Sequence, residues 1–223
     1  RREARMRSEA SADVDDIVGE WTDTVMQSGA SPTEFDRDGD GETDEIRWGT
    51  PVNPGGGQSG YGYVDNPDLE FQTVLTNQAF TIGTFTHYNN PINGAELLET
   101  TLVVNFVVTI DGVEYDVGPI EIQFNHEETS NNGTPEQNRD IIDIVAQTVT
   151  VNINGVDYEL EVLGLIDEMG NVVTEVRTFE GQANSYQLVV RFVNTEQFEL
   201  TGNVLTNDNS GADEPVEVVA ATG

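Results

Sequence analysis

The stretch Phe80–Ile92, FTIGTFTHYNNPI, opens the most strongly patterned part of this 223-residue chain and decides its fold class. Its first residues are mostly apolar or threonine, as in a β-strand, and one of only two histidines, His87, follows them. The run Thr101–Ile110 then places apolar side chains at every second position, which is the period of a strand. Further valines between these positions predict that this strand is buried on both faces.

Turn sequences between the apolar runs predict antiparallel hairpins. Asp111-Gly112 and Asn154-Gly155 are both tight-turn pairs flanked by alternating residues. Further strands are predicted at Ile120–Phe124 and Tyr186–Phe192, where apolar and polar side chains also alternate. Frequent strands with little helix predict an all-β fold, an antiparallel β-sandwich. A jelly-roll-like arrangement is favoured over a closed barrel, because the strands differ in length and the loops are long.

Two segments have less regular patterns. Residues 3–18 are predicted as a short N-terminal helix, because Met6, Ala10, Val14, Ile17 and Val18 fall on one helical face. A solvated linker is the alternative, since the flanking residues are highly charged. Ile141–Ile153 is predicted to resume strand character after a polar, turn-rich segment.

The charge of the chain excludes several classes of partner. Nine arginines, no lysine and 41 acidic residues give a net charge of −32. This charge argues against nucleic acid and anionic membranes, and it favours a setting rich in calcium or salt, where self-repulsion is screened. No apolar run approaches the length of a membrane span, so direct membrane insertion is not expected. There is no cysteine, hence no disulfide and no thiolate-bound zinc.

The sharpest local motif is FDRDGDGETDE, residues 35–45. Alternating aspartates followed by a glycine match the opening of a calcium loop, in which hard carboxylate and carbonyl oxygens surround one cation. Position 12 of such a loop would be Arg47 in place of the usual bidentate glutamate, so the motif does not predict an EF-hand. The alternative is a solvated acidic loop. The predicted calcium ligands are Asp36, Asp38, Asp40, Glu42, Asp44 and Glu45.

The two histidine segments, THYNN and FNHEET, form a second candidate site. Its predicted members are His87, Asn89, His126 and Glu128, which would form a shared polar site at one end of the sandwich and bind an ion. The alternative is that both histidines are structural and tie loop backbones by hydrogen bonds. Zinc is disfavoured because only two imidazoles exist, although carboxylates could complete a zinc site.

Three other features carry less chemical information. The glycine-rich segment 55–60 lacks the lysine of a phosphate-binding loop. The carboxylates are so numerous that a hydrolase-like pair would arise by chance, so no catalytic residue is assigned. Aromatic side chains near the glycine-rich segment could instead stack on sugars, although core packing is their commoner role: Trp21, Trp48, Tyr61, Tyr63 and Tyr88.

The ordered pieces EIRWGTP, GGGQSGYGY, FTIGTFTHYNNPI, IEIQFNHEETSN and GVDYELEVLGL resemble the choice-of-anchor K domain family. The resemblance covers residues 19–198 and implies a bacterial secreted or cell-surface protein without an assigned catalytic role. Thr201–Val219, TGNVLTNDNSGADEPVEVV, resembles the start of a VCBS or cadherin-like adhesin repeat. The expected division is therefore a helix or linker at 1–18, the sandwich at 19–198, and a linker with a truncated Ig-like repeat at 199–223.

These observations predict a non-catalytic, calcium-stabilised extracellular module of a bacterial surface protein or repetitive adhesin. Its expected partners are cell-surface or matrix components and neighbouring repeats of the same chain. The alternative is a carbohydrate-binding module of a secreted glycan-active protein, with calcium as a structural ion. A glycan hydrolase is a third and weaker hypothesis, supported only by abundant carboxylates and the two histidines.

Overall fold

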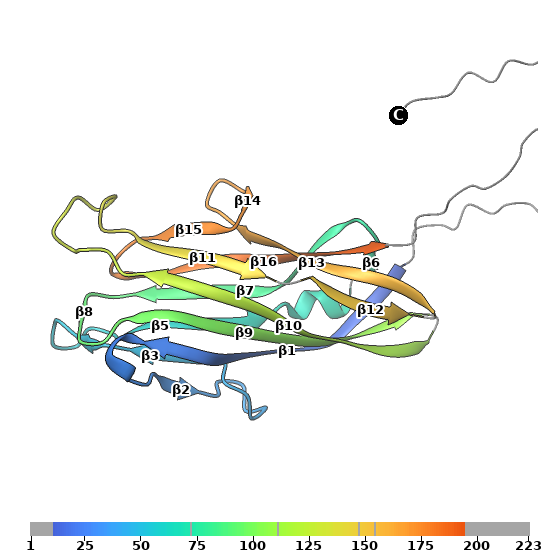
Figure 1. The fold of residues 1–223 in the computed structure, drawn as a ribbon, viewed down its shortest axis with the longest axis horizontal. Helices are drawn as coiled ribbons and strands as arrows, with labels where there is room; N and C mark the ends of the chain where they lie inside the picture. The colour runs from blue at the N-terminus through green and yellow to red at the C-terminus, as the bar shows by residue number, and fades with distance from the viewer. Residues whose placement is uncertain (1–10, 72, 111, 147, 154, 195–223) are drawn as a thin grey trace, which may run out of the picture.

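In the computed structural model, which describes residues 11–71, 73–110, 112–146, 148–153 and 155–194, two antiparallel sheets pack face to face (Figure 1). The first sheet has the strand order β15 (Glu175–Thr178), β11 (Asp140–Ala146), β10 (Val113–Glu127), β9 (Leu97–Ile110), β1 (Ser11–Met26) and β6 (Thr73–Leu75). The second has the order β12 (Val149–Ile153), β13 (Val156–Ile166), β16 (Gln182–Asn194), β7 (Ala79–Asn89), β5 (Ser59–Asp65), β3 (Glu45–Trp48) and β2 (Thr33–Phe35).

The remaining elements are short. The strand β14 (Val172–Val173) pairs with β13, and β4 (Thr50–Pro51) pairs with β8 (Ile92–Asn93). Two 3-10 helices, η1 (Gln27–Gly29) and η2 (Pro67–Phe71), connect strands. The chain switches repeatedly between the two sheets, and the all-β sandwich prediction is confirmed. Among the described residues, no helix is long and apolar enough to cross a membrane.

The predicted N-terminal helix is wrong for residues 11–18, which are the first half of the strand β1. This strand pairs with β6 through Ser11–Asp13 and with β9 from Asp13 onward. A β-bulge between Asp15 and Val18, with Asp16 at φ 49°, shifts the alternation along the strand. The shift mimics the spacing of a helical face, and pairing with two strands overrides it. Residues 3–10 of the prediction lie outside the described residues.

The run Ile141–Ile153 divides into two strands that belong to different sheets. β11 pairs with β10 in the first sheet, whereas β12 pairs with β13 in the second. The two hairpins predicted from turn sequences are present, since Ile110 pairs with Val113 and Ile153 pairs with Val156. The residue pattern therefore identified strands here but did not locate the crossing between the sheets.

Aromatic rings from both sheets fill the core between them. Phe124 on β10 lies 4.7 Å from Phe85 on β7 and 5.2 Å from Trp21 on β1, measured between ring centroids. Tyr61 on β5 lies 4.9 Å from Phe85 and is fully buried. Tilted and edge-on aromatic pairs of this kind add to the stabilisation from burial alone. The strongest packing thus joins β1 and β10 of the first sheet to β5 and β7 of the second.

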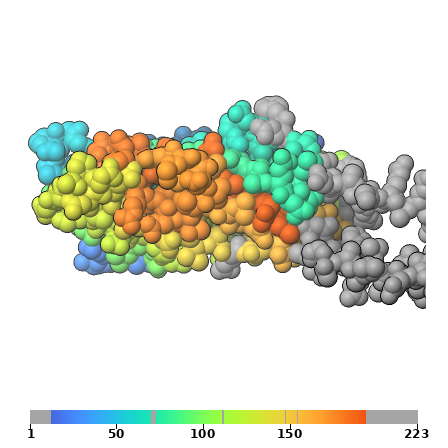
Figure 2. All heavy atoms as spheres, turned by 90° about the horizontal axis from the view of Figure 1, so that it is seen from above, coloured from blue at the N-terminus to red at the C-terminus, as the bar shows by residue number. Residues whose placement is uncertain are grey.

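The strands β7 and β10 both end at the side of the sandwich shown on the left in Figure 1. The segment that follows β10 (yellow) and the glycine-rich segment before β5 (light blue) form that same end in the space-filling view (Figure 2). At this end the core changes in character. The buried side chains of β7 and β10 become polar at His87, Asn89 and His126.

Two leucines on β9 allow a matched test of this core. Leu102 is fully buried, whereas Leu98 on the same strand is 44% exposed. We expect Leu102→Ala to lower the free energy of unfolding by about 2–5 kcal/mol, because it leaves a cavity between the sheets. We expect Leu98→Ala to cost about 1 kcal/mol or less. Urea unfolding followed by fluorescence would measure both, and equal costs would contradict the inward orientation of Leu102.

Candidate functional site

Ionisable side chains from both sheets meet inside the polar end of the sandwich. His87, His126 and Asp140 each offer a ligand atom, and these atoms lie within 4.8 Å of one another. Glu128, Asp140 and Glu180 also offer carboxylate oxygens within 4.8 Å of one another. We call these five residues the inter-sheet cluster. His87 comes from the second sheet, whereas His126 and Asp140 come from the first.

Strand alternation explains why these polar residues point inward. On β10, His126 continues the buried row of Ile120, Ile122 and Phe124. On β11, Asp140 begins the buried row that continues with Ile142 and Ile144. On β7, His87 and Asn89 follow Phe85 in the same way. Each residue is thus inward-facing because it occupies the core side of its strand.

Each histidine is fixed through one ring nitrogen. His87 Nδ1 is 2.8 Å from the Thr178 hydroxyl, and His126 Nδ1 is 2.6 Å from the Tyr61 hydroxyl. The two ring centroids are 5.2 Å apart. His126 Nε2 lies 3.4 Å from a carboxylate oxygen of Glu128, whereas His87 Nε2 is buried without a hydrogen-bond partner. The Nε2 atom of His87 is therefore available as a ligand.

The buried polar groups around the histidines are only half satisfied. Asp140 Oδ1 accepts a hydrogen bond of 2.8 Å from the Thr129 backbone N–H, but Asp140 Oδ2 has no partner. Asn89 donates to the Thr178 carbonyl at 3.1 Å, while its own Oδ1 is also without a partner. Leaving such groups buried and unpaired costs about 1–3 kcal/mol each. A further ligand at this position would remove that cost.

Burial shifts the pKa values in the inter-sheet cluster so that the neutral forms are favoured: the carboxyl pKa values rise and the imidazole pKa values fall. Burial and the charge of Glu128 raise the pKa of Asp140 to about 7, and burial with the charge of Glu96 raises that of Glu128 to about 7. Burial lowers the pKa of His126 to about 4, against the opposing charges of Asp140 and Glu96. Burial, with the charges of His126 and Arg47, holds the pKa of His87 well below its usual value. Neutral imidazoles are the form that binds metal ions.

The acidic motif forms an exposed loop between β2 and β3. Asp36, Asp38 and Asp40 offer carboxylate oxygens within 4.8 Å of one another. Asp36 accepts hydrogen bonds from the backbone N–H groups of Gly39 and Gly41, at 2.6 and 3.1 Å. Both glycines have positive φ, 89° and 99°, which the tight loop requires. The sequence therefore brings the first three predicted calcium ligands together.

The other predicted calcium ligands have different environments. Asp44 is buried, and its carboxylate accepts hydrogen bonds from the backbone N–H groups of Arg37 and Asp38 at 2.6 and 3.4 Å. Glu45 is paired with Arg37 and Arg47. Burial alone would raise the pKa of Glu45, but hydrogen bonds from the two arginines lower it. Glu42 is half-buried, and its N–H donates to Asp40 at 2.8 Å.

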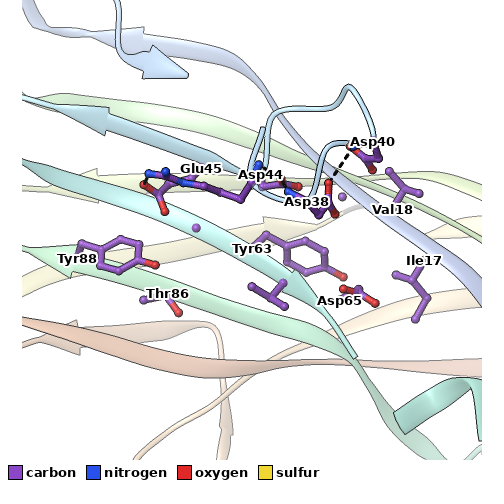
Figure 3. Close-up of a pocket in the computed structure, with 14 residues that line it drawn as sticks. Ile17, Val18, Asp38, Asp40, Asp44, Glu45, Tyr63, Asp65, Thr86 and Tyr88 are labelled. Atoms are coloured by element: carbon purple, nitrogen blue, oxygen red, sulfur yellow. Dashed lines mark hydrogen bonds and ion pairs between the residues drawn. The ribbon is translucent and has the colours of Figure 1, made fainter. Parts of the chain in front are cut away.

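The acidic loop borders an open groove of 380 Å³. Figure 3 shows Asp38, Asp40 and Asp44 on one side of this groove and Tyr63, Asp65, Thr86 and Tyr88 on the other. Tyr63 is buried, and Tyr88 packs under the Arg47 guanidinium, 3.5 Å from the ring centroid. The groove therefore has an acidic rim, and the two tyrosines that line it are buried or half-buried.

Four of the five aromatic residues considered as a sugar-stacking surface are core residues. Trp21, Trp48, Tyr61 and Tyr63 are all buried, and Tyr88 is half-buried beneath Arg47. Trp48 and Tyr61 pack edge to face at 5.1 Å, next to the two histidines. None of these buried rings can lie flat against a sugar. The carbohydrate-binding alternative was based on these aromatic side chains, and their burial removes that support.

The four residues predicted as a polar site do converge, but the prediction missed important members. Asp140, Glu180, Thr178 and Tyr61 complete the site. A signal for Asp140 was present in the sequence, because strand alternation places it on the same face as Ile142 and Ile144. No comparable local pattern marks Glu180, which lies in the turn between β15 and β16.

Comparisons with known proteins do not extend this description. No protein-family model matches the chain. A search of curated proteins also finds no match. The resemblance to choice-of-anchor K domains and adhesin repeats therefore stays a prediction, and residues 195–223 lie outside the described residues.

The raised pKa of Asp140 predicts a specific pH dependence of stability in metal-free protein. Between about pH 4 and pH 7, Asp140 is protonated in the folded state and ionised in the unfolded state. Its contribution to the free energy of unfolding therefore falls as pH rises across this window. We expect Asp140→Asn to become more stable relative to wild type by at least about 1 kcal/mol from pH 4 to pH 7.

Urea unfolding with a chelator present, at constant ionic strength, would measure this difference. The lowered pKa values of His87 and His126 make the free energy of unfolding rise with pH over the same range, opposite to the effect of Asp140. The comparison with Asp140→Asn is needed to separate the two effects. Glu128, Glu180 and Glu96 also contribute charge near the site. A stability difference that does not change with pH would contradict the assigned environment of Asp140.

Proposed function

We propose that this domain is a non-catalytic, calcium-stabilised extracellular module of a bacterial surface protein or repetitive adhesin. The observation that carries the proposal is the convergence of Asp36, Asp38 and Asp40 in an exposed loop. In this proposal calcium binds the loop and stiffens the β2–β3 edge of the sandwich. The partners of the domain are cell-surface or matrix components and neighbouring repeats of the same chain.

The chemistry of the loop favours calcium over other common ions. All of its offered ligand atoms are oxygens, which hard cations prefer, and the loop is exposed and irregular. Calcium accepts six to eight oxygen ligands in flexible geometry, so backbone carbonyls and water can complete the shell. Magnesium demands a stricter octahedron and gives up its water reluctantly. Three clustered carboxylates also repel one another, and a divalent cation removes this repulsion.

An extracellular setting is consistent with the affinity expected of such a loop. Asp44 is buried and Glu45 is paired with two arginines, which leaves the three exposed aspartates as the main acidic ligands. Extracellular calcium modules bind with dissociation constants of about 10⁻⁴–10⁻³ M, well above those of cytosolic calcium sensors. The net charge of −32 adds long-range attraction for cations. The resemblance to secreted surface proteins supports the same setting.

Two aspartate variants of equal charge test the calcium site. Asp38→Asn removes one carboxylate while keeping an oxygen that can accept the hydrogen bond from the Asp40 N–H, which is 3.1 Å long. Asp116→Asn makes the same charge change at an exposed position on β10. We expect calcium at a hundred times its dissociation constant to stabilise wild type and Asp116→Asn by about 2.7 kcal/mol. We expect Asp38→Asn to lose most of this gain.

Thermal unfolding with calcium, with chelator and with sodium chloride at matched ionic strength would measure the effect. Stabilisation that follows ionic strength alone, and that is equal in both variants, would indicate screening of the acidic surface. That result would contradict a specific calcium site in the loop.

A further inference from the structure

We propose that the inter-sheet cluster is a second metal site, one that binds a zinc-class transition ion through His87, His126, Asp140 and Glu128. This ion would join the two sheets at the polar end of the sandwich. The site differs from the acidic loop in position, burial and ligand type, so the two proposals stand independently. Four observations support it.

The first observation is that the ligands converge from both sheets. His87 lies on β7, whereas His126 and Asp140 lie on β10 and β11 across the interface. Their ligand atoms lie within 4.8 Å of one another, and His87 and Asp140 are fully buried. Neighbouring ligand atoms of a tetrahedral zinc ion are about 3.3 Å apart, as follows from Zn–N and Zn–O bonds of about 2.0–2.2 Å. Small side-chain rotations would therefore close the site around an ion.

The second observation is that two buried polar atoms of the inter-sheet cluster lack partners. His87 Nε2 and Asp140 Oδ2 have no hydrogen-bond partner. Both residues are fully buried, and buried polar groups normally find partners. Coordination of one ion would satisfy both atoms at once.

The third observation is that the other atom of each buried ligand is already fixed. The Nδ1 atoms of His87 and His126 are hydrogen-bonded to the hydroxyl groups of Thr178 and Tyr61. Asp140 Oδ1 accepts a hydrogen bond from the Thr129 backbone N–H. Metal-binding histidines almost always use their second nitrogen in this way, which fixes the ring orientation and the tautomer. The inter-sheet cluster therefore has the outer hydrogen bonds of a metal site as well as its ligands.

The fourth observation is the balance of charge. Glu128, Asp140 and Glu180 bring carboxylate oxygens within 4.8 Å of one another, with Asp140 buried and the two glutamates half-buried. Among the ion pairs of the described residues, no arginine pairs with any of these three. Arg139 instead pairs with Glu136 and Glu168. A divalent cation would supply the missing positive charge, since buried charges require a partner or a metal.

The mixture of ligands identifies the class of ion. Imidazole nitrogen suits zinc, copper, nickel and iron, whereas calcium and magnesium are bound by oxygen alone. Two imidazoles with two carboxylates can complete the four-coordinate shell that is usual for structural zinc. Burial of the ligands favours a structural ion over a catalytic one, because a catalytic metal keeps an open position for substrate. Zinc was disfavoured from the sequence because only two imidazoles exist, and Asp140 supplies a further ligand from outside the two histidine segments.

Metal-stripped protein titrated with zinc and with cobalt tests the proposal. We expect one equivalent of zinc to bind and to raise the melting temperature by several degrees, with excess magnesium present to occupy weak carboxylate sites. Cobalt should give the visible absorption of a four-coordinate site. Both ions should also alter the fluorescence of Trp48, whose ring lies 5.5 Å from that of His126. Cobalt absorption reports on the ligands directly, apart from any effect on stability.

Matched variants locate the ion. Asp140→Asn keeps the oxygen that accepts from Thr129 but removes the ligating charge, and we expect it to weaken zinc binding at least tenfold. Asp143→Asn makes the same change three residues along β11 and should bind as wild type does. Asp38→Asn should also bind zinc normally, which separates this site from the calcium loop. If Asp140→Asn does not fold, Glu128→Gln at the edge of the site replaces it and should weaken binding too.

Failure to bind cobalt or zinc in the wild-type protein would overturn the proposal and leave a network of protonated carboxylates and neutral histidines. Equal zinc binding by wild type, Asp140→Asn and Glu128→Gln would also overturn it, because the ion would then lie elsewhere on the acidic surface. Calcium stabilisation through Asp38 could persist in either case. Loss of the calcium effect alone would affect only the proposed function.

Discussion

The structure depends on how two sheets bury both apolar and ionisable side chains in one interface. Most of that interface is an aromatic and aliphatic core, in which Trp21, Phe85 and Phe124 join β1, β7 and β10. Tyr61 belongs to this core and also contacts His126 through its hydroxyl at 2.6 Å. This one side chain therefore connects the apolar packing to the polar end. The rigid core determines where the histidines lie.

The two candidate ion sites differ in how the negative charge of their carboxylates is accommodated. In the acidic loop the carboxylates are exposed, so water and salt screen part of their repulsion. In the inter-sheet cluster Asp140 is buried and the two glutamates are half-buried, so their negative charge must be neutralised or compensated. Loss of a cation from the loop should therefore have local consequences. Loss of a cation from the inter-sheet cluster would affect the contact between the sheets.

The sequence was sufficient to predict the sandwich, most of its core strands and the clustering of three loop aspartates. It was insufficient where pairing partners decide the outcome. The bulge at Asp15–Val18 produced helix-like spacing within β1, and no local pattern marked the crossing from β11 to β12. Glu45 resembled a calcium ligand, but folding places it between Arg37 and Arg47. The first two outcomes depend on strand pairing between distant segments, whereas the arginine partners of Glu45 lie eight and two residues away in the sequence.

The histidines show most clearly what alternation can reveal. The alternative that they tie loop backbones does not fit their Nδ1 contacts, which are to hydroxyl groups on strands β15 and β5. Each histidine has a hydroxyl partner on Nδ1, and the carboxylate of Asp140 offers an oxygen near both imidazoles. The inward rows of β7, β10 and β11 bring both imidazoles and Asp140 together between the sheets. Acidic and imidazole groups at core positions of neighbouring strands are therefore better read together than residue by residue.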